Sequence, residues 1–275
     1  MDDIVTISPG LEEMIADLAN VSTALWDKGW AERNAGNASA NVTSFMPLTI
    51  PRSKLADVPR TAAPLVCPEM AGQYILVTGT GRRFRDFARK PAVNSCILRV
   101  TEDGTACQLV WGGDGDPGFR PTSEFPSHMM IHQLLWTGKD PARVVLHTHP
   151  TELIALTHIP EYTEEKALNR ALWAIHPEVK IAVPTGVGLV PYTLPSSVEL
   201  AKLTVASLAA KHRVIIWEKH GVLAVAPDAS TALDLIEVTN KAAEIIIMCK
   251  SAGTNPTGLT KAQIDEVVKA FKLKE

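Results

Sequence analysis

The stretch VVLHTH, residues 144–149, places two histidines at the end of a short apolar run. Successive side chains on a β-strand point to opposite faces, so residues two apart point to the same side. The stretch therefore predicts a strand at 144–147 whose end carries the His147 and His149 imidazoles on one side. A third histidine, His220, follows a second β-rich run at 214–217 and precedes another at 222–226. Three histidines at strand ends predict a three-nitrogen metal site.

Zinc in catalytic sites takes three protein ligands, three histidines among them, and leaves one coordination position open. Spacing alone also allows paired histidines that only fill the surface or the core. A second pair, His128 and His132, has the four-residue spacing of helical metal ligands. Apolar residues separate this pair, however, and the glutamate of the His-Glu-x-x-His motif is absent. We therefore do not interpret His128 and His132 as ligands.

The composition predicts one soluble domain spanning residues 1–275. With 275 residues, 46% of them hydrophobic, the chain can bury a single large core. The net charge of −3 and the lack of a basic stripe argue against a nucleic-acid partner. The acidic start and the lack of an 18-residue apolar run argue against a signal peptide and a membrane partner. Four cysteines without C-x-x-C pairing suit a reducing compartment, so we expect a cytoplasmic protein.

Hydrophobic periodicity predicts interleaved helices and strands. Capping-box patterns at Ser196 with Glu199 and at Thr260 with Gln263 predict two helix starts, the first helix reaching about Lys211. The predicted helices are 10–27, 125–136, 164–175 and 232–250. The predicted strands are 74–77, 97–100, 107–111, 144–147 and 180–183, with a hairpin turn at 102–104.

The proline-rich segment at about 38–71 breaks this periodicity. It predicts a long irregular insertion whose ends carry short strands, and long loops in compact domains are often functional. The whole pattern indicates an α/β fold, a single three-layer domain with a central, mostly antiparallel sheet covered by helices.

Three small polar segments could hold an anion. Residues 122–124, Thr-Ser-Glu, precede the helix at 125–136, where free backbone N–H groups collect negative charge. Residues 78–81, Thr-Gly-Thr-Gly, follow a strand, and residues 34–37, Asn-Ala-Gly-Asn, follow the first helix. Taken singly, each also has an ordinary interpretation as a helix cap or a turn. Together, ahead of the His-x-His strand, they favour a phosphate pocket beside a metal.

These motifs, with the late His220-Gly221 pair, resemble the class II aldolase and adducin family. The resemblance covers essentially the whole chain and implies that family's fold. It implies zinc on His147, His149 and His220, about one ion per subunit. It implies a catalytic glutamate at Glu124 and a second at Glu178 that acts across a subunit boundary of a homotetramer. The residues implied for substrate phosphate binding are Asn34, Gly36, Asn37, Thr80, Gly81, Thr122 and Ser123.

The resemblance further implies a zinc-dependent lyase with a phosphorylated ketose as its substrate. The long insertion favours the members that split L-rhamnulose 1-phosphate into dihydroxyacetone phosphate and L-lactaldehyde. In this retro-aldol reaction zinc would stabilise the enediolate, and Glu124 would move the proton on C3. An L-fuculose-phosphate aldolase, a pentulose-phosphate 4-epimerase and a non-enzymatic, adducin-like assembly module remain open alternatives.

Overall fold

Nine strands form one sheet in a computed structural model that describes residues 5–46, 52–56, 58–114, 116 and 118–273. The strands are β1 (Asn37–Asn41), β2 (Arg60–Ala62), β3 (Tyr74–Thr78), β4 (Ser95–Val100), β5 (Ala106–Gly112), β6 (Val144–Thr148), β7 (Gly188–Val190), β8 (Val214–Trp217) and β9 (Gly221–Ala226). Their order across the sheet is β2-β5-β4-β3-β1-β6-β9-β8-β7. Among these strands only β7 and β8 pair in parallel, so the prediction of a mostly antiparallel sheet is confirmed.

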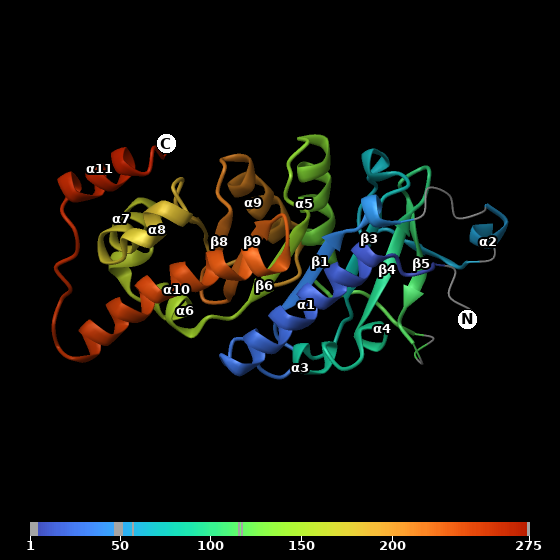
Figure 1. Cartoon of the computed structure of the whole chain (residues 1–275), viewed down its shortest axis with the longest axis horizontal. Coiled ribbons are helices and arrows are strands. Elements are labelled where there is room, and N and C mark those ends of the chain that lie inside the picture. The colour runs from blue at the N-terminus through green and yellow to red at the C-terminus, as the bar shows by residue number, and fades with distance from the viewer. Residues whose placement is uncertain (1–4, 47–51, 57, 115, 117, 274–275) are drawn as a thin grey trace.

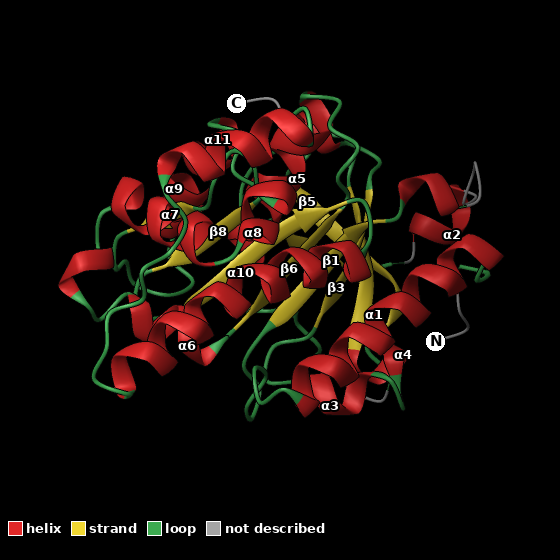
Figure 2. Ribbon diagram, turned by 60° about the vertical axis from the view of Figure 1, so that its left-hand side comes forward, coloured by secondary structure: helices red, strands yellow, loops and turns green. Residues whose placement is uncertain are grey.

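Helices cover both faces of this sheet and make a three-layer α/β domain (Figure 1, Figure 2). One face lies under α1, α6 and α10, and the other lies under α5 and α9. The helices are α1 (Pro9–Asp27), α2 (Arg52–Ala56), α3 (Phe84–Phe87), α4 (Pro91–Asn94), α5 (Phe125–Thr137), α6 (Thr151–Leu156), α7 (Glu165–Ile175), α8 (Pro177–Ala182), α9 (Val198–Ala209), α10 (Ala229–Ser251) and α11 (Lys261–Ala270), with 3₁₀ turns η1 (Thr43–Phe45), η2 (Pro68–Met70) and η3 (Pro160–Tyr162). None of these described helices is both long and apolar enough to cross a membrane.

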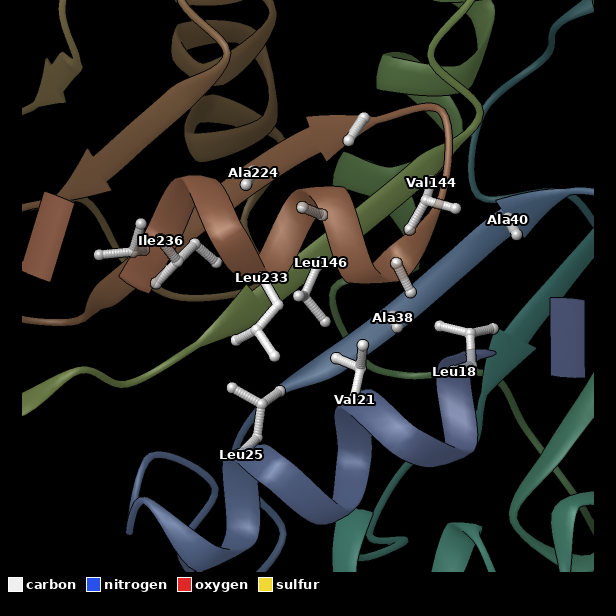
Figure 3. Close-up of a cluster of buried hydrophobic side chains, with 14 of the residues drawn as sticks. Leu18, Val21, Leu25, Ala38, Ala40, Val144, Leu146, Ala224, Leu233 and Ile236 are labelled. Carbon is white, nitrogen blue, oxygen red and sulfur yellow. The ribbon is translucent and has the colours of Figure 1, made fainter. Parts of the chain in front are cut away.

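Helix α1 shows why the main core forms. The Ser8 side chain caps its start by accepting a hydrogen bond from the Leu11 N–H, and Pro9 takes the first turn. Leu18, Val21 and Leu25 recur at helical spacing and are buried against the sheet and α10, as Figure 3 shows. Burying each such side chain stabilises the fold by about 1.5–3 kcal/mol. The loop that follows α1 reaches the end of β6, where the Trp30 carbonyl accepts from the Thr148 hydroxyl.

Strand β1 lies at the centre of the sheet, between β3 and β6, although its sequence NASAN is poor in strand-forming residues. Its small side chains suit a position covered on both faces. Ala38 and Ala40 face α1 and α10, and Ser39 faces α5. Strand β1 therefore forms the start of the segment interpreted as an irregular insertion at 38–71. The remainder of the described segment holds η1, α2, β2 and η2, and residues 47–51 and 57 lie outside the described residues.

Most of the other predicted elements are confirmed, including the helices at 10–27, 125–136, 164–175 and 232–250. The predicted strand at 180–183 is wrong, because Pro177 starts the short helix α8 there. In α8 the Lys180 ammonium donates to the Pro184 carbonyl, and the parallel edge strand is β7. The cap predicted at Ser196 is shifted by one residue, since Ser197 accepts from the Leu200 N–H.

The predicted capping box at the last helix is confirmed. The Thr260 hydroxyl accepts from the Gln263 N–H, while the Gln263 side chain accepts from the Thr260 N–H at 2.8 Å.

Candidate active site

The three predicted metal ligands meet where β6 ends and β9 begins. His147 is the fourth residue of β6, His149 follows the strand by one residue, and His220 ends the turn before β9. Because β6 and β9 pair antiparallel, the end of one lies beside the start of the other. One ring nitrogen from each histidine lies within 4.8 Å of the others. The sequence-based prediction of a three-histidine cluster is thus confirmed in the geometry.

Hydrogen bonds at the far side of two rings orient them for metal binding. The Nδ1 of His147 lies 2.9 Å from the Val222 carbonyl oxygen, and the Nδ1 of His149 lies 3.0 Å from Glu32 Oε1. Both carbonyl and carboxylate oxygens accept, so Nδ1 carries the proton and Nε2 keeps its lone pair for a metal. Such outer partners are typical of metal-binding histidines.

The surroundings of the His220 and His147 rings also suit metal binding. The Nδ1 of His220 is buried without a partner among the described residues, and its Nε2 faces Glu124. Burial and the imidazoles of His149 and His220 hold the pKa of His147 well below its ordinary value. Burial lowers the pKa of His220 to about 4. These two rings are therefore neutral near pH 7, the state in which imidazole binds a metal.

Gly221 explains why a glycine follows the third histidine. A Cβ atom added there would lie 2.7 Å from the Thr148 carbonyl oxygen and 2.8 Å from His147 Cε1. It would also lie 2.8 Å from His149 Cδ2. Any other residue would push the ligand rings apart, so the chain keeps this space free for the cluster.

Glu124 lies beside the three rings, at the residue that precedes α5. Its side chain is buried, with Oε2 3.6 Å from His147 Nε2 and Oε1 3.6 Å from His220 Nε2. Burial raises the pKa of Glu124 above its ordinary value, although the Asn37 hydrogen bond and the nearby His149 act in the opposite direction. A buried carboxyl group with a raised pKa beside a cleft is a candidate for proton transfer.

The three polar segments meet the histidines in a cleft of about 190 Å³. The Thr80 N–H donates to the Arg120 carbonyl and the Thr122 N–H donates to the Thr78 carbonyl, which holds two segments side by side. Gly36 has φ of +76°, and a Cβ there would lie 3.0 Å from the His147 carbonyl oxygen, so only glycine lets this segment approach β6. The cleft is lined by Asn34, Ala35, Gly36, Asn37, Gly79, Thr80, Gly81, Thr122, Ser123, Glu124, His147, His149, Pro195, Ser196 and His220.

Every residue predicted for metal or phosphate binding lines this cleft, and so does Glu124. Glu178 is exposed on α8 and is not among the described residues that line it. The ordinary cap interpretation of Thr122 and Ser123 does not hold. The cap residue of α5 is Glu124, whose side chain makes no capping hydrogen bond, and among the described residues the Thr122 hydroxyl accepts only from the Glu124 N–H, at 3.4 Å.

Sequence reasoning missed Pro195 and Ser196 as lining residues. Ser196 has a φ of +63°, and its hydroxyl donates to the Ser123 hydroxyl over 3.0 Å. The serine pair 196–197 before a helix indicated a cap and nothing more. No signal in the sequence pointed to the contact with residue 123, because it joins segments far apart in the chain.

The chain belongs to the class II aldolase and adducin family. The model of the Class II Aldolase and Adducin N-terminal domain matches residues 16–247. The chain is 39% identical over 274 residues to a rhamnulose-1-phosphate aldolase of Bacteroides thetaiotaomicron, covering 99% of each chain. It is 33% identical over 269 residues to a rhamnulose-1-phosphate aldolase of Listeria innocua, covering 94% of this chain and 92% of that one.

Solved structures show the same fold. A sugar-phosphate aldolase from Thermotoga maritima superposes with a TM-score of 0.74 at 33% identity, covering 90% of this chain and all of that one. An L-fuculose-1-phosphate aldolase from Thermus thermophilus superposes with a TM-score of 0.54 at 20% identity, covering 90% of this chain and 99% of that one. The second likeness shows the fold alone.

Proposed function

We propose that this protein is a zinc-dependent lyase that cleaves L-rhamnulose 1-phosphate into dihydroxyacetone phosphate and L-lactaldehyde. The observation that carries the proposal is the position of Glu124, 3.6 Å from two of the three clustered histidines and in the same cleft as the polar segments. The relatives named as rhamnulose-1-phosphate aldolases, which this chain matches along nearly its whole length, support the choice of sugar.

The polar segments would hold the substrate phosphate. Asn34, Thr80 and Ser123 offer neutral donors, and backbone N–H groups near the start of α5 add more. Gly36 and Gly81, both at positive φ, let the backbone approach the phosphate closely. We assign Asn37 and Thr122 to the same pocket. Binding the phosphate here places the ketose carbons next to the histidines and Glu124.

The histidines 147, 149 and 220 would hold Zn²⁺, which supplies a Lewis acid that stabilises negative charge on the substrate oxygens. The C3–C4 bond breaks, and its electron pair stays on the half that becomes dihydroxyacetone phosphate. Glu124 supplies the proton that completes this product at C3, and its raised pKa favours the protonated form that the step needs. The C4 hydroxyl gives its proton to solvent as the aldehyde forms, and Glu124 takes a proton back from solvent, so the reaction neither consumes nor releases protons overall.

We place Glu178 at the aldehyde end of a neighbouring subunit's site, in a homotetramer. Its exposed position on α8, away from the cleft of its own chain, suits that role. Light scattering should give the mass of four chains, and a fully active monomer would contradict this assignment. We further propose a cytoplasmic location, in keeping with the free cysteines 67, 96, 107 and 249.

The direct test follows dihydroxyacetone phosphate release from several sugars. L-Rhamnulose 1-phosphate should give the highest kcat/KM, ahead of L-fuculose 1-phosphate, while L-ribulose 5-phosphate should not be epimerised. A higher kcat/KM for the fuculose ester, or epimerisation alone, would replace the proposed substrate. Protein that binds metal but transforms none of these sugars would favour an assembly module. A chelator should abolish cleavage and zinc should restore it.

A further inference from the structure

Four polar side chains lie buried between the sheet and α5. Asn37 and Ser39 are two residues apart on β1, so they share one face of the strand. His128 and His132 are four residues apart on α5, so they share one face of the helix. The exposed fractions are 8% for Asn37 and at most 1% for the other three. The two pairs face each other, with Asn37 at the wall of the cleft and the other three side chains behind it.

Hydrogen bonds join these side chains into one row that ends on Glu124. Ser39 Oγ lies 2.7 Å from His132 Nε2 and 2.7 Å from His128 Nδ1. His128 Nε2 lies 2.6 Å from Asn37 Oδ1. Asn37 Nδ2 then donates to Glu124 Oε2 over 2.8 Å.

The chemistry of each group fixes the direction of every bond in this row. Because the Asn37 amide nitrogen donates to Glu124, its Oδ1 faces His128, which must donate from Nε2. Burial lowers the pKa of both histidines to about 3, so both rings are neutral. A neutral His128 protonated at Nε2 can only accept at Nδ1, so the Ser39 hydroxyl donates to it. The Ser39 oxygen then accepts from Nε2–H of His132.

We propose that the row His132, Ser39, His128 and Asn37 positions Glu124 for proton transfer. Each donor points toward the carboxylate, and the row fixes the Asn37 amide so that its nitrogen holds Oε2. Oε1 then keeps its orientation toward His220 Nε2, 3.6 Å away, at the wall of the cleft. Ser39 and the two histidines are sealed from the cleft, so they are positioning residues. The inference rests on the proposed role of Glu124.

Ser39→Ala tests the row, because it removes one buried hydroxyl and adds no bulk. Dihydroxyacetone phosphate in D₂O supplies the readout, since a positioned Glu124 exchanges the hydrogens of its hydroxymethyl carbon. We expect the exchange rate and the kcat of cleavage to fall together by about 10–100-fold, a loss typical of outer-sphere groups. KM should change by less than about two-fold, and the metal content should stay at the wild-type level.

Ser127→Ala is the matched control. Ser127 is buried on α5 beside His128, and its hydroxyl has no hydrogen-bond partner among the described residues. Replacing this serine by alanine should leave the hydrogen-exchange rate and the kcat of cleavage at the wild-type level.

A second pair of variants changes His132, where glutamine keeps a donor near the Nε2 position and leucine removes it. His132→Gln should retain more of both rates than His132→Leu, whether or not Ser39→Ala folds.

The outcomes separate this inference from the proposed function. Equal rates in Ser39→Ala and Ser127→Ala would overturn it. A loss of rate that follows the metal content would overturn it too. So would a rise in KM with kcat unchanged. Exchange that falls in Ser39→Ala while the wild type leaves L-rhamnulose 1-phosphate uncleaved would support the positioning and refute the proposed substrate. A wild-type protein with neither exchange nor cleavage would overturn both.

Discussion

The Glu32 carboxylate lies 3.0 Å from Nδ1 of His149, so this nitrogen is engaged and Nε2 is left for the three-histidine cluster. The same loop after α1 also holds the end of β6 through its backbone. The Trp30 carbonyl accepts a 2.6 Å hydrogen bond from the Thr148 hydroxyl and a 2.9 Å bond from the His149 N–H. The loop that follows the first helix therefore helps to orient His149, a predicted ligand more than a hundred residues away in the sequence.

Removing this carboxylate should weaken metal binding. In Glu32→Ala the His149 ring loses the partner that fixes its orientation and raises its basicity, so we expect the metal dissociation constant to rise by about 10–100-fold. Competition with a chromophoric chelator measures the constant. Glu13→Ala, at an exposed position on α1, is the control. Equal affinity in the two variants would mean that Glu32 does not support the ligand.

The buried ligand His147 should be indispensable for the metal. His147→Ala leaves two nitrogens where a catalytic zinc site needs three, so elemental analysis should show most of the metal gone from a chain that otherwise holds about one ion. His158→Ala changes an exposed histidine and should keep the full content. Full retention of zinc in His147→Ala would disprove the three-histidine assignment.

Glu124→Gln should separate chemistry from folding and metal binding. The amide preserves the shape and its oxygen can still accept from Asn37, but it cannot carry the proton. We expect kcat to fall by about 10²–10⁴-fold, the usual contribution of a positioned acid–base group. Steady-state kinetics together with metal content and melting temperature make the comparison. A kcat near that of the wild type would remove Glu124 from the reaction.

The exposed Thr80 hydroxyl should contribute to reading the phosphate. A hydrogen bond to a charged group is worth about 1.5–3 kcal/mol, so Thr80→Val should lower kcat/KM for L-rhamnulose 1-phosphate by about 10–100-fold. The value for unphosphorylated L-rhamnulose, low from the start, should hardly change. Thr61→Val, on the exposed strand β2, serves as control. If Thr80→Val lowers kcat/KM equally for both sugars, the residue supports the fold and not the phosphate site.

The buried histidine His132 should make stability depend on pH. Its pKa is about 3 in the folded chain and near 6.5 when unfolded, so below pH 6.5 the unfolded chain binds the extra proton. The contribution of neutral His132 to the free energy of unfolding is thus fully present above pH 6.5 and is lost as the pH falls toward 3. One unit below 6.5, at pH 5.5, the loss is about 1.4 kcal/mol for this residue.

Urea unfolding at pH 7.5 and 5.5 measures that loss, and His132→Gln is the comparison because glutamine does not titrate. The variant should lose about 1.4 kcal/mol less than the wild type between the two pH values. Metal release at low pH affects both proteins and cancels in the difference. An equal loss in both would show that His132 is already charged when folded.

Local patterns predicted most of the site because each of its parts is continuous in the sequence. The period of two at His147 and His149, and the glycines in residues 34–37 and 78–81, are visible without a structure. What brings these parts together is strand pairing, and pairing partners cannot be read from one sequence. The strand predicted at 180–183 failed for a local reason, since four residues are too few to separate a strand from a buried helical turn.

The buried row behind Glu124 was missed for a different reason. The sequence analysis set His128 and His132 apart from the predicted metal ligands, yet their partner Ser39 lies in a stretch that looks irregular. Polar residues spaced by two at Asn37 and Ser39, and by four on an otherwise apolar helix, were the available signal. Small residues such as those of β1 form a strand only because both neighbouring strands are present.

The pairing register of β1 with β6 determines how the residues of the candidate active site lie relative to one another. Asn37 stands opposite His147 and Ser39 opposite Val145, so this pairing sets where the polar segment 34–37 lies relative to the three histidines. A slip of one residue would shift that position by about 3.3 Å and turn Asn37 and Ser39 toward α1. Deleting Ala38 or Ala40 from β1 would therefore separate the proposed phosphate pocket from the three histidines while leaving every proposed active-site residue in the chain.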